Sequence, residues 1–262
     1  MINIRSILRY LLVGFIASLL AIALNPTARE TVSNNAIFLP APSMAVSSEE
    51  KDVDYMTNLG LMKGHLLVGK ELIEAGEAEQ AEPHMGHPIE ELYVDLEQQL
   101  NERGVEQFKT TLNGLHDFVM AGATDTNKVN SMYQKTMQEI DAAISDLSAE
   151  ERQNPKFVLQ VINGLLDTAG AEYEAGILDS KIEEVIEYQD SRGFVNYAEI
   201  LYKNIADEMA SKYSDIHQKI QSNMTELKKA WPSALAPETA AMPPAEVSQL
   251  IEEIEQSSQQ IR

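Results

Sequence analysis

The chain of 262 residues contains no cysteine, and its 41 acidic side chains against 20 basic ones give a formal net charge of −21. The lack of cysteine excludes disulfides, thiolate metal sites and thiol nucleophiles, so any metal would need His, Asp, Glu or Met ligands. The acidic balance disfavours nucleic acid and anionic lipid as partners, and it favours cations or a basic protein partner.

The N-terminal segment has the pattern of an export signal. Two arginines precede an apolar run over residues 10–24, which is shorter than the roughly 20 apolar residues that a transmembrane helix needs. We predict that residues 1–24 are a signal peptide or an uncleaved N-terminal anchor, and small residues at Ala23 and Ala45 offer two cleavage sites. The rest of the chain would be exported to a periplasm or lumen, and an uncleaved segment would be its contact with the membrane.

From residue 53 onward the apolar residues recur at helical spacing almost throughout, and no stretch has a convincing strand pattern. The predicted segments are, in chain order, a linker or cleaved tail over 25–52, helices over about 53–76, 88–103, 105–122, 127–147 and 155–176, a shorter segment over 177–188, a break at Arg192–Gly193, a long helix over 194–231, a proline-rich linker over 232–244 and a C-terminal helix over 245–262. This order predicts an all-α fold: an up-and-down helical bundle over residues 53–231, built as one or two packed sub-bundles.

Four polar side chains fall on helix faces that the apolar pattern predicts to be buried: His65, His116, Glu172 and Glu208. An ionised carboxylate alone in a core is costly, so it should pair, protonate or bind a cation. A histidine on such a face either bonds an oxygen inside the core or serves as a metal ligand. Bundle cores are common places for metal sites made of carboxylates and histidines.

The stretch AEPHMGHPIEELY (residues 81–93) has two interpretations, and the first is purely structural. Pro88 suits the first position of a helix, Gly86 permits the turn into it, and the acids that follow complement the helix dipole. This interpretation predicts a helix that begins at Pro88, but it leaves His84 and His87 unexplained.

The second interpretation is a metal site. His84, His87 and Glu90 are spaced by three residues and would converge on one cation just ahead of the helix. Imidazole together with carboxylate suits zinc, iron or copper(II). His65 and His116 would either complete this site or structure the core.

Known enzyme templates are absent from the sequence. None of the five histidines follows a glutamate by three residues, as the di-iron bundles require. The sequence also lacks His-Glu-x-x-His, Gly-x-Ser-x-Gly and a phosphate-binding glycine loop. We therefore predict that the protein is not an enzyme.

Two segments carry a resemblance to a known family. GHPIEELY (residues 86–93) resembles the Gly-x-His-x-x-Glu signature of the imelysin-like family of exported bacterial helical-bundle proteins, which includes periplasmic iron-uptake components. EYQDSRGFVNYAEILYKNIADEM (residues 187–209) is similar to a helix start late in those proteins. The resemblance implies a helical double bundle, an exported location and a link to metal acquisition, with His87 and Glu90 at the His and Glu of the signature. The sequence departs from the signature because no residue separates the glycine from His87.

Two functions follow from these observations. The first is an exported, non-catalytic helical-bundle protein that binds a divalent or trivalent metal ion (zinc, iron or copper) in metal uptake or sensing. The second is an acidic scaffold or accessory protein in a periplasm or lumen that holds a basic protein partner without metal. Convergence of His65, His84, His87 and His116 in one place would favour the first function.

Overall fold

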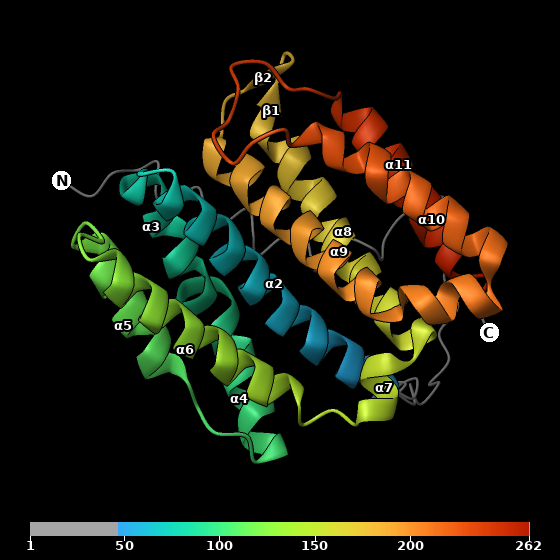
Figure 1. Ribbon diagram of the computed structural model, residues 1–262, viewed down its shortest axis with the longest axis horizontal. Coiled ribbons are helices and arrows are strands. Elements are labelled where there is room, and N and C mark those ends of the chain that lie inside the picture. The colour runs from blue at the N-terminus through green and yellow to red at the C-terminus, as the bar shows by residue number, and fades with distance from the viewer. Residues whose placement is uncertain (1–46, 262) are drawn as a thin grey trace, which may run out of the picture. The chain divides into compact units, whose positions relative to one another are not determined.

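The computed structural model describes residues 47–261, and the predicted signal or anchor segment lies outside the described residues. The described part is an all-α helical bundle, as the apolar periodicity predicts (Figure 1). Its elements are, in chain order, α2 (Ser48–Glu74), α3 (Ala78–His87), the π-helical segment η2 (Pro88–Leu92), α4 (Tyr93–Arg103), α5 (Lys109–Met120), α6 (Thr126–Ile144), α7 (Ala149–Gln153), α8 (Pro155–Gly176), β1 (Ile177–Leu178), β2 (Lys181–Ile182), α9 (Val185–Lys212), α10 (Ser214–Leu227), the 3-10 turn η3 (Lys228–Ala230) and α11 (Pro244–Ser258).

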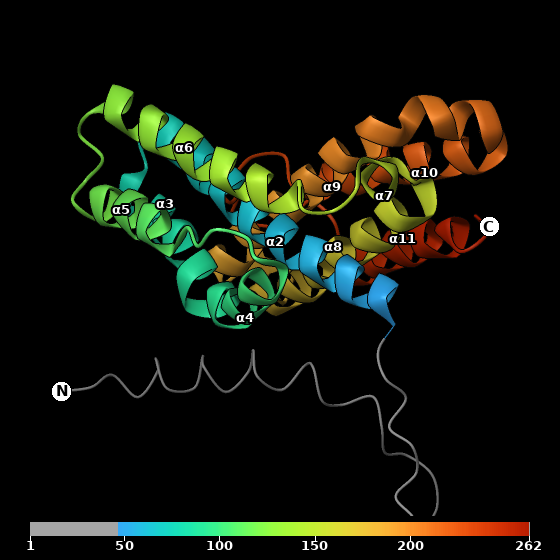
Figure 2. The same ribbon diagram turned by 90° about the horizontal axis from the view of Figure 1, so that it is seen from below.

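Helix α2 is the central element, and it packs against α3 and α6 as well as against α8 and α9 (Figures 1 and 2). Its start is fixed by a capping box, in which the side chains of Ser47 and Glu50 each accept a hydrogen bond from the backbone N–H of the other residue. This start lies inside the segment that the sequence predicted as a linker. Nearly every residue between Leu59 and Gly69 is buried, as expected for a helix with neighbours all round.

The remaining helices form two sets, so the bundle consists of two packed sub-bundles that share α2. Helices α3 to α6 make the first set, and α8 to α11 make the second (Figure 2). In the second set α8 contacts α9, α9 contacts α10, α10 contacts α11, and α11 returns to α8. This closed ring of contacts is a four-helix bundle.

Two predicted helix boundaries in the second half of the chain are wrong. Helix α9 runs without interruption through Arg192–Gly193, where a break was predicted. Gly193 lies inside the helix because α9 crosses α2 there at short range, and a Cβ on Gly193 would lie 2.8 Å from the carbonyl carbon of Gly64. The predicted long helix 194–231 ends early, because the chain leaves the helical conformation at Tyr213 and α10 then folds back against α9.

The helix start predicted at Pro88 is also wrong, because the chain is already helical before it. Helix α3 begins ten residues earlier, at Ala78, and continues through η2 into α4. Proline lacks the N–H that an α-helical ladder uses, and its ring crowds the preceding turn. The wider π-helical segment η2 accommodates Pro88 without ending the helix.

A short hairpin and a long connection cover one end of α9. Strands β1 and β2 pair antiparallel, which the sequence did not predict. We call residues 231–243, between η3 and α11, the strap. Backbone bonds join the strap to the hairpin at Ile182 N–Glu238 O and Ala240 N–Ser180 O.

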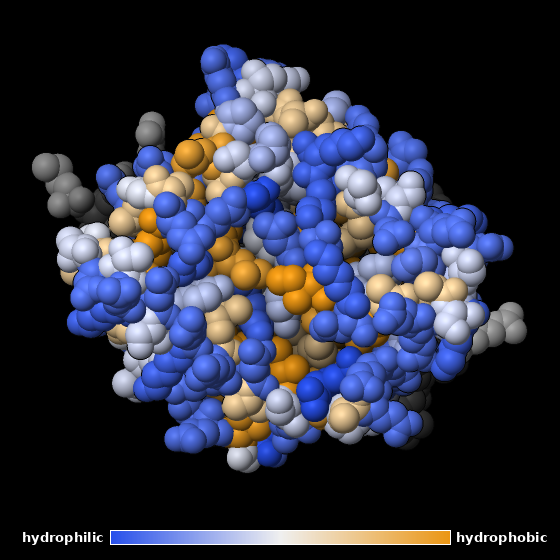
Figure 3. All heavy atoms as spheres, viewed as in Figure 1, coloured by the Kyte–Doolittle hydropathy of each residue, from blue (hydrophilic) through white to orange (hydrophobic). Residues whose placement is uncertain are grey.

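One face of the molecule shows how hydrophilic and hydrophobic residues are distributed on the surface. The face in Figure 3 is mostly hydrophilic, and apolar side chains gather near its middle. Among the helices within residues 47–261, none combines the length and the apolar character that crossing a bilayer would require.

Candidate metal centre

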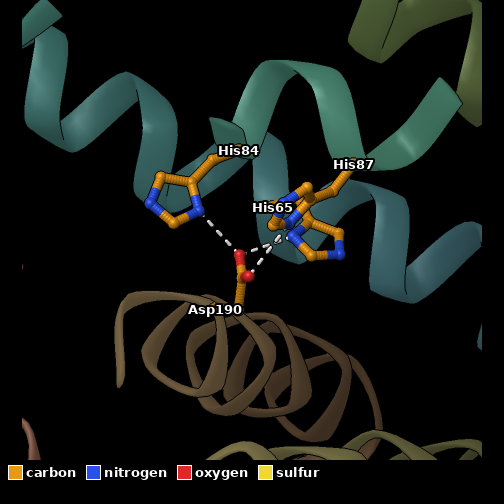
Figure 4. A group of neighbouring side chains, drawn as sticks. All are labelled: His65, His84, His87 and Asp190. Carbon is orange, nitrogen blue, oxygen red and sulfur yellow. Dashed lines mark hydrogen bonds and ion pairs between the residues drawn. The ribbon is translucent and has the colours of Figure 1, made fainter. Parts of the chain in front are cut away.

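Three histidines converge on one buried carboxylate, Asp190, where α2, α3 and α9 meet (Figure 4). The Nδ1 atoms of His65 and His84 lie 2.6 Å and 2.7 Å from Asp190 Oδ1. The Nδ1 atom of His87 lies 3.0 Å from Asp190 Oδ2. One potential ligand atom from each of these four residues lies within 4.8 Å of the other three.

The centre is closed except on the side of His87. The side chain of His84 is fully buried, and those of His65 and Asp190 are 3% and 6% exposed, whereas that of His87 is 19% exposed. On this open side the carboxylate of Glu91 lies 3.9 Å from His87 Nε2. A cation from solvent would therefore reach Asp190 past His87 and an acidic side chain.

Glycines bring the three helices close enough for these side chains to meet. Gly64 and Gly193 form the crossing of α2 and α9, beside His65 and three residues after Asp190. Gly69 performs the same role between α2 and α3, because a Cβ there would lie 3.2 Å from the Cβ of His84. Larger residues at these positions would push the ligand-bearing helices apart.

His87 lies directly before the π-helical segment η2. His87 is the last residue of α3, and η2 begins at Pro88. The π turn therefore directly follows the ligand-bearing end of α3. π-helical turns inside α-helices occur frequently at functional sites.

The charges in the centre favour an ionised carboxylate facing imidazole N–H groups. Burial alone would raise the pKa of Asp190, but the charges and hydrogen bonds of His65 and His84 outweigh it and hold that pKa well below its usual range. Burial alone would lower the pKa of His87, but the hydrogen bond and charge of Asp190, with the charges of Glu91 and Glu90, raise it to about 9.

Glu172, on α8, supplies a first testable prediction. Burial, assisted by the negative charges of Asp190, Glu187 and Glu91, raises its pKa from 4.5 to about 8. Because this pKa is higher in the folded chain than in the unfolded chain, the stability that Glu172 contributes is fully present below pH 4.5 and is lost as the pH rises through about 8. In metal-free protein, Glu172→Gln should therefore be more stable than the wild type by on the order of 2 kcal/mol at pH 9.

Urea denaturation in the presence of a chelator, at pH 4.5 and at pH 9, measures this difference. Glu174→Gln, on the exposed face of the same helix, is the control and should leave the pH profile of stability unchanged. An equal stability of Glu172→Gln and wild type at pH 9 would show that the carboxyl group is not held in its neutral form.

The structure brings three of the five predicted ligands together and leaves two outside. His65, His84 and His87 are in the cluster. His116, on α5, instead bonds Glu82, with His116 Nε2 lying 2.6 Å from Glu82 Oε1. Glu90 is exposed on η2 and acts on His87 through its charge.

Asp190 is the member of the cluster that the sequence interpretation missed. It lies four residues before Phe194 and seven before Tyr197, so it falls on the buried stripe of α9. Extending that stripe backward through Gly193 would have found it. The predicted break at Arg192–Gly193 concealed the pattern.

Residues 148–262 match the family model of the iron permease-associated 4-helix bundle domain. No curated protein and no solved structure matches the chain. The matched range contains α8, α9, α10 and α11, the helices that form the closed ring of contacts. The comparison therefore supports a helical-bundle domain with an iron-related context. The matched range includes Asp190 but none of the three histidines of the cluster. The match does not test the resemblance to the imelysin-like family.

Proposed function

We propose that this protein binds a single transition-metal cation through His65, His84, His87 and Asp190, and that it does so without catalysing a reaction. The observation that carries the proposal is the convergence of three imidazoles on one buried carboxylate from three helices. Imidazole nitrogens with a carboxylate oxygen suit zinc, iron and copper(II). Donors held at about 2.0–2.2 Å from one metal lie about 3–4 Å from each other, so the four side chains need only small shifts.

The same contacts indicate how the cation would be accommodated. An ionised carboxylate only accepts hydrogen bonds, so the Nδ1 atoms that face Asp190 donate to it. A cation would replace the hydrogens of this arrangement and interact with the same nitrogen and oxygen atoms. Because protons compete with a metal for imidazole, the affinity should fall at acidic pH.

The wider role that we propose is metal acquisition or sensing outside the cytoplasm. The match of residues 148–262 to the iron permease-associated domain supports iron as the first cation to test. The arginines and apolar run at the N-terminus support export to a periplasm or lumen. The imelysin-like resemblance of residues 86–93 supports both points.

Calorimetric titration of the purified full-length chain with Fe²⁺ under anaerobic conditions, Zn²⁺ and Cu²⁺ tests the proposal. We expect one ion per chain with micromolar or tighter affinity for at least one of these metals. At 100 times its dissociation constant, that metal should raise the free energy of unfolding by about 2.7 kcal/mol. His84→Ala should remove the tight binding, because it deletes the most buried ligand.

His217→Gln is the control, because His217 bonds Tyr202 on the far part of α9 and takes no part in the cluster. It should bind the metal as the wild type does. Equal binding by wild type and His84→Ala, or no binding by either, would contradict the proposal. The alternative of a partner-binding scaffold predicts the second outcome.

A further inference from the structure

Gln189 is a buried amide that joins the metal centre to the strap. Its side chain is 1% exposed. Its Oε1 atom lies 2.9 Å from His84 Nε2. Its Nε2 atom donates to the backbone carbonyl of Ala234, at 3.0 Å, and to Gln80 Oε1, at 3.1 Å.

The carbonyl of Ala234 determines which way this amide points. A backbone carbonyl only accepts hydrogen bonds, so the NH₂ group of Gln189 must face it. The amide oxygen of Gln189 therefore faces His84. An amide oxygen also only accepts, so the hydrogen in that contact belongs to His84 Nε2. The ring nitrogen left for a cation is His84 Nδ1, the atom that lies 2.7 Å from Asp190.

The neighbours of Gln189 on α9 hold the strap in the same place. Tyr188 donates its hydroxyl to the carbonyl of Ser233. Ser191 accepts from the indole of Trp231, and Arg192 donates to the carbonyl of Trp231. Asp190 is thus flanked on both sides in sequence by residues that bind the strap, while its own side chain faces the histidines.

We infer that Gln189 is a positioning residue of the metal centre, held by the strap, which fixes His84 in the form that presents Nδ1 to the cation. This inference rests on the proposed metal binding. The second hydrogen-bond partner of a metal-bound histidine fixes its ring orientation and tautomer, and it is usually a carboxylate, a backbone carbonyl or water. Here a neutral side-chain amide takes that role, and its own orientation is determined by a segment more than 40 residues along the chain.

Cobalt(II) is the probe for the test, because its visible absorption bands report the geometry of its ligands. Gln189→Leu removes the acceptor for His84, so it should bind Co²⁺ about 10–100-fold more weakly than the wild type and with a shifted spectrum. Gln189→Glu keeps an oxygen facing His84 but lacks the NH₂ group that bonds Ala234, so it should bind Co²⁺ more tightly than Gln189→Leu while its spectrum stays shifted from that of the wild type. Asn163→Leu removes a half-buried amide between α8 and α11, away from the centre, and should change neither.

A measurement on the metal-free wild type keeps the test independent of folding defects in the variants. Long-range ¹H–¹⁵N NMR should show a hydrogen on His84 Nε2, and an unprotonated Nε2 would overturn the inference. Wild-type binding that is lost in His84→Ala but unchanged in affinity and spectrum in Gln189→Leu would overturn this inference alone. An absence of Co²⁺, Zn²⁺, Fe²⁺ and Cu²⁺ binding by the wild type would overturn the proposed function together with it.

Discussion

Asp190→Asn should reduce the metal affinity of the chain by more than about 100-fold. Losing an outer-shell partner of a metal ligand costs up to about 100-fold, and Asp190 is itself a proposed ligand. Asp190 is the one carboxylate in the cluster and the residue that all three histidines contact. Asparagine keeps the shape of the side chain but removes the negative charge that offsets a cation. Calorimetry with the metal that the wild type binds most tightly measures the loss.

The control for this substitution is Asp167→Asn, which changes an exposed carboxylate of α8 that takes no part in the cluster. It should bind the metal with wild-type affinity. The far-ultraviolet circular dichroism of Asp190→Asn should stay helical, because the replacement has nearly the same volume. Wild-type affinity in Asp190→Asn would mean that the cation binds elsewhere, and the assignment of the centre would be wrong.

The fold was predictable because most of the longer helices carry their own apolar stripe. Helix α8, for example, was predicted over 155–176, and it has Asn154 as N-cap and Pro155 at its first position, both typical of a helix start. The helix boundaries that were predicted wrongly are those that depend on contacts between helices. Gly193 looks like a helix terminator in isolation, but its contact with Gly64 shows that this position inside α9 requires glycine for the close crossing.

The candidate site was predictable in part, because helical periodicity also shows which polar side chains lie on buried faces. Helical periodicity placed His65 on a buried face, and the spacing of His84 and His87 placed both near one helix end. Periodicity cannot state which neighbouring helix a face meets, so His116 was grouped with the ligands, whereas its ring bonds Glu82 outside the cluster. The carboxylate on which the histidines converge comes from α9, and local sequence rules give no information on that pairing.

The crossing of α2 and α9 leads to the second large prediction, on stability. Gly193→Ala should destabilise the fold by about 3 kcal/mol, at the upper end of the usual cost of overpacking a core. The added Cβ would lie 2.8 Å from the carbonyl carbon of Gly64 and closer still to its oxygen. These are backbone atoms, so no side-chain rotation relieves the contact, and α9 must move away from α2. Urea denaturation monitored by circular dichroism measures the change.

Gly114→Ala is the matched control, because it makes the same substitution inside α5, where the nearest atom to the new Cβ is Met132 Cε at 3.5 Å. That is ordinary contact, so the variant should be as stable as the wild type or up to about 1 kcal/mol more stable through its higher helix propensity. Gly193→Ala with wild-type stability would contradict the close crossing of α2 and α9. Because moving α9 also carries Asp190 away from His65, Gly193→Ala should weaken metal binding together with stability. Asp190→Asn also loses the hydrogen bonds that the buried carboxylate accepts from three histidines, so it should lower stability as well. Unlike Gly193→Ala, it adds no atom at the crossing of α2 and α9, and this contrast separates the packing that assembles the centre from the ligand chemistry.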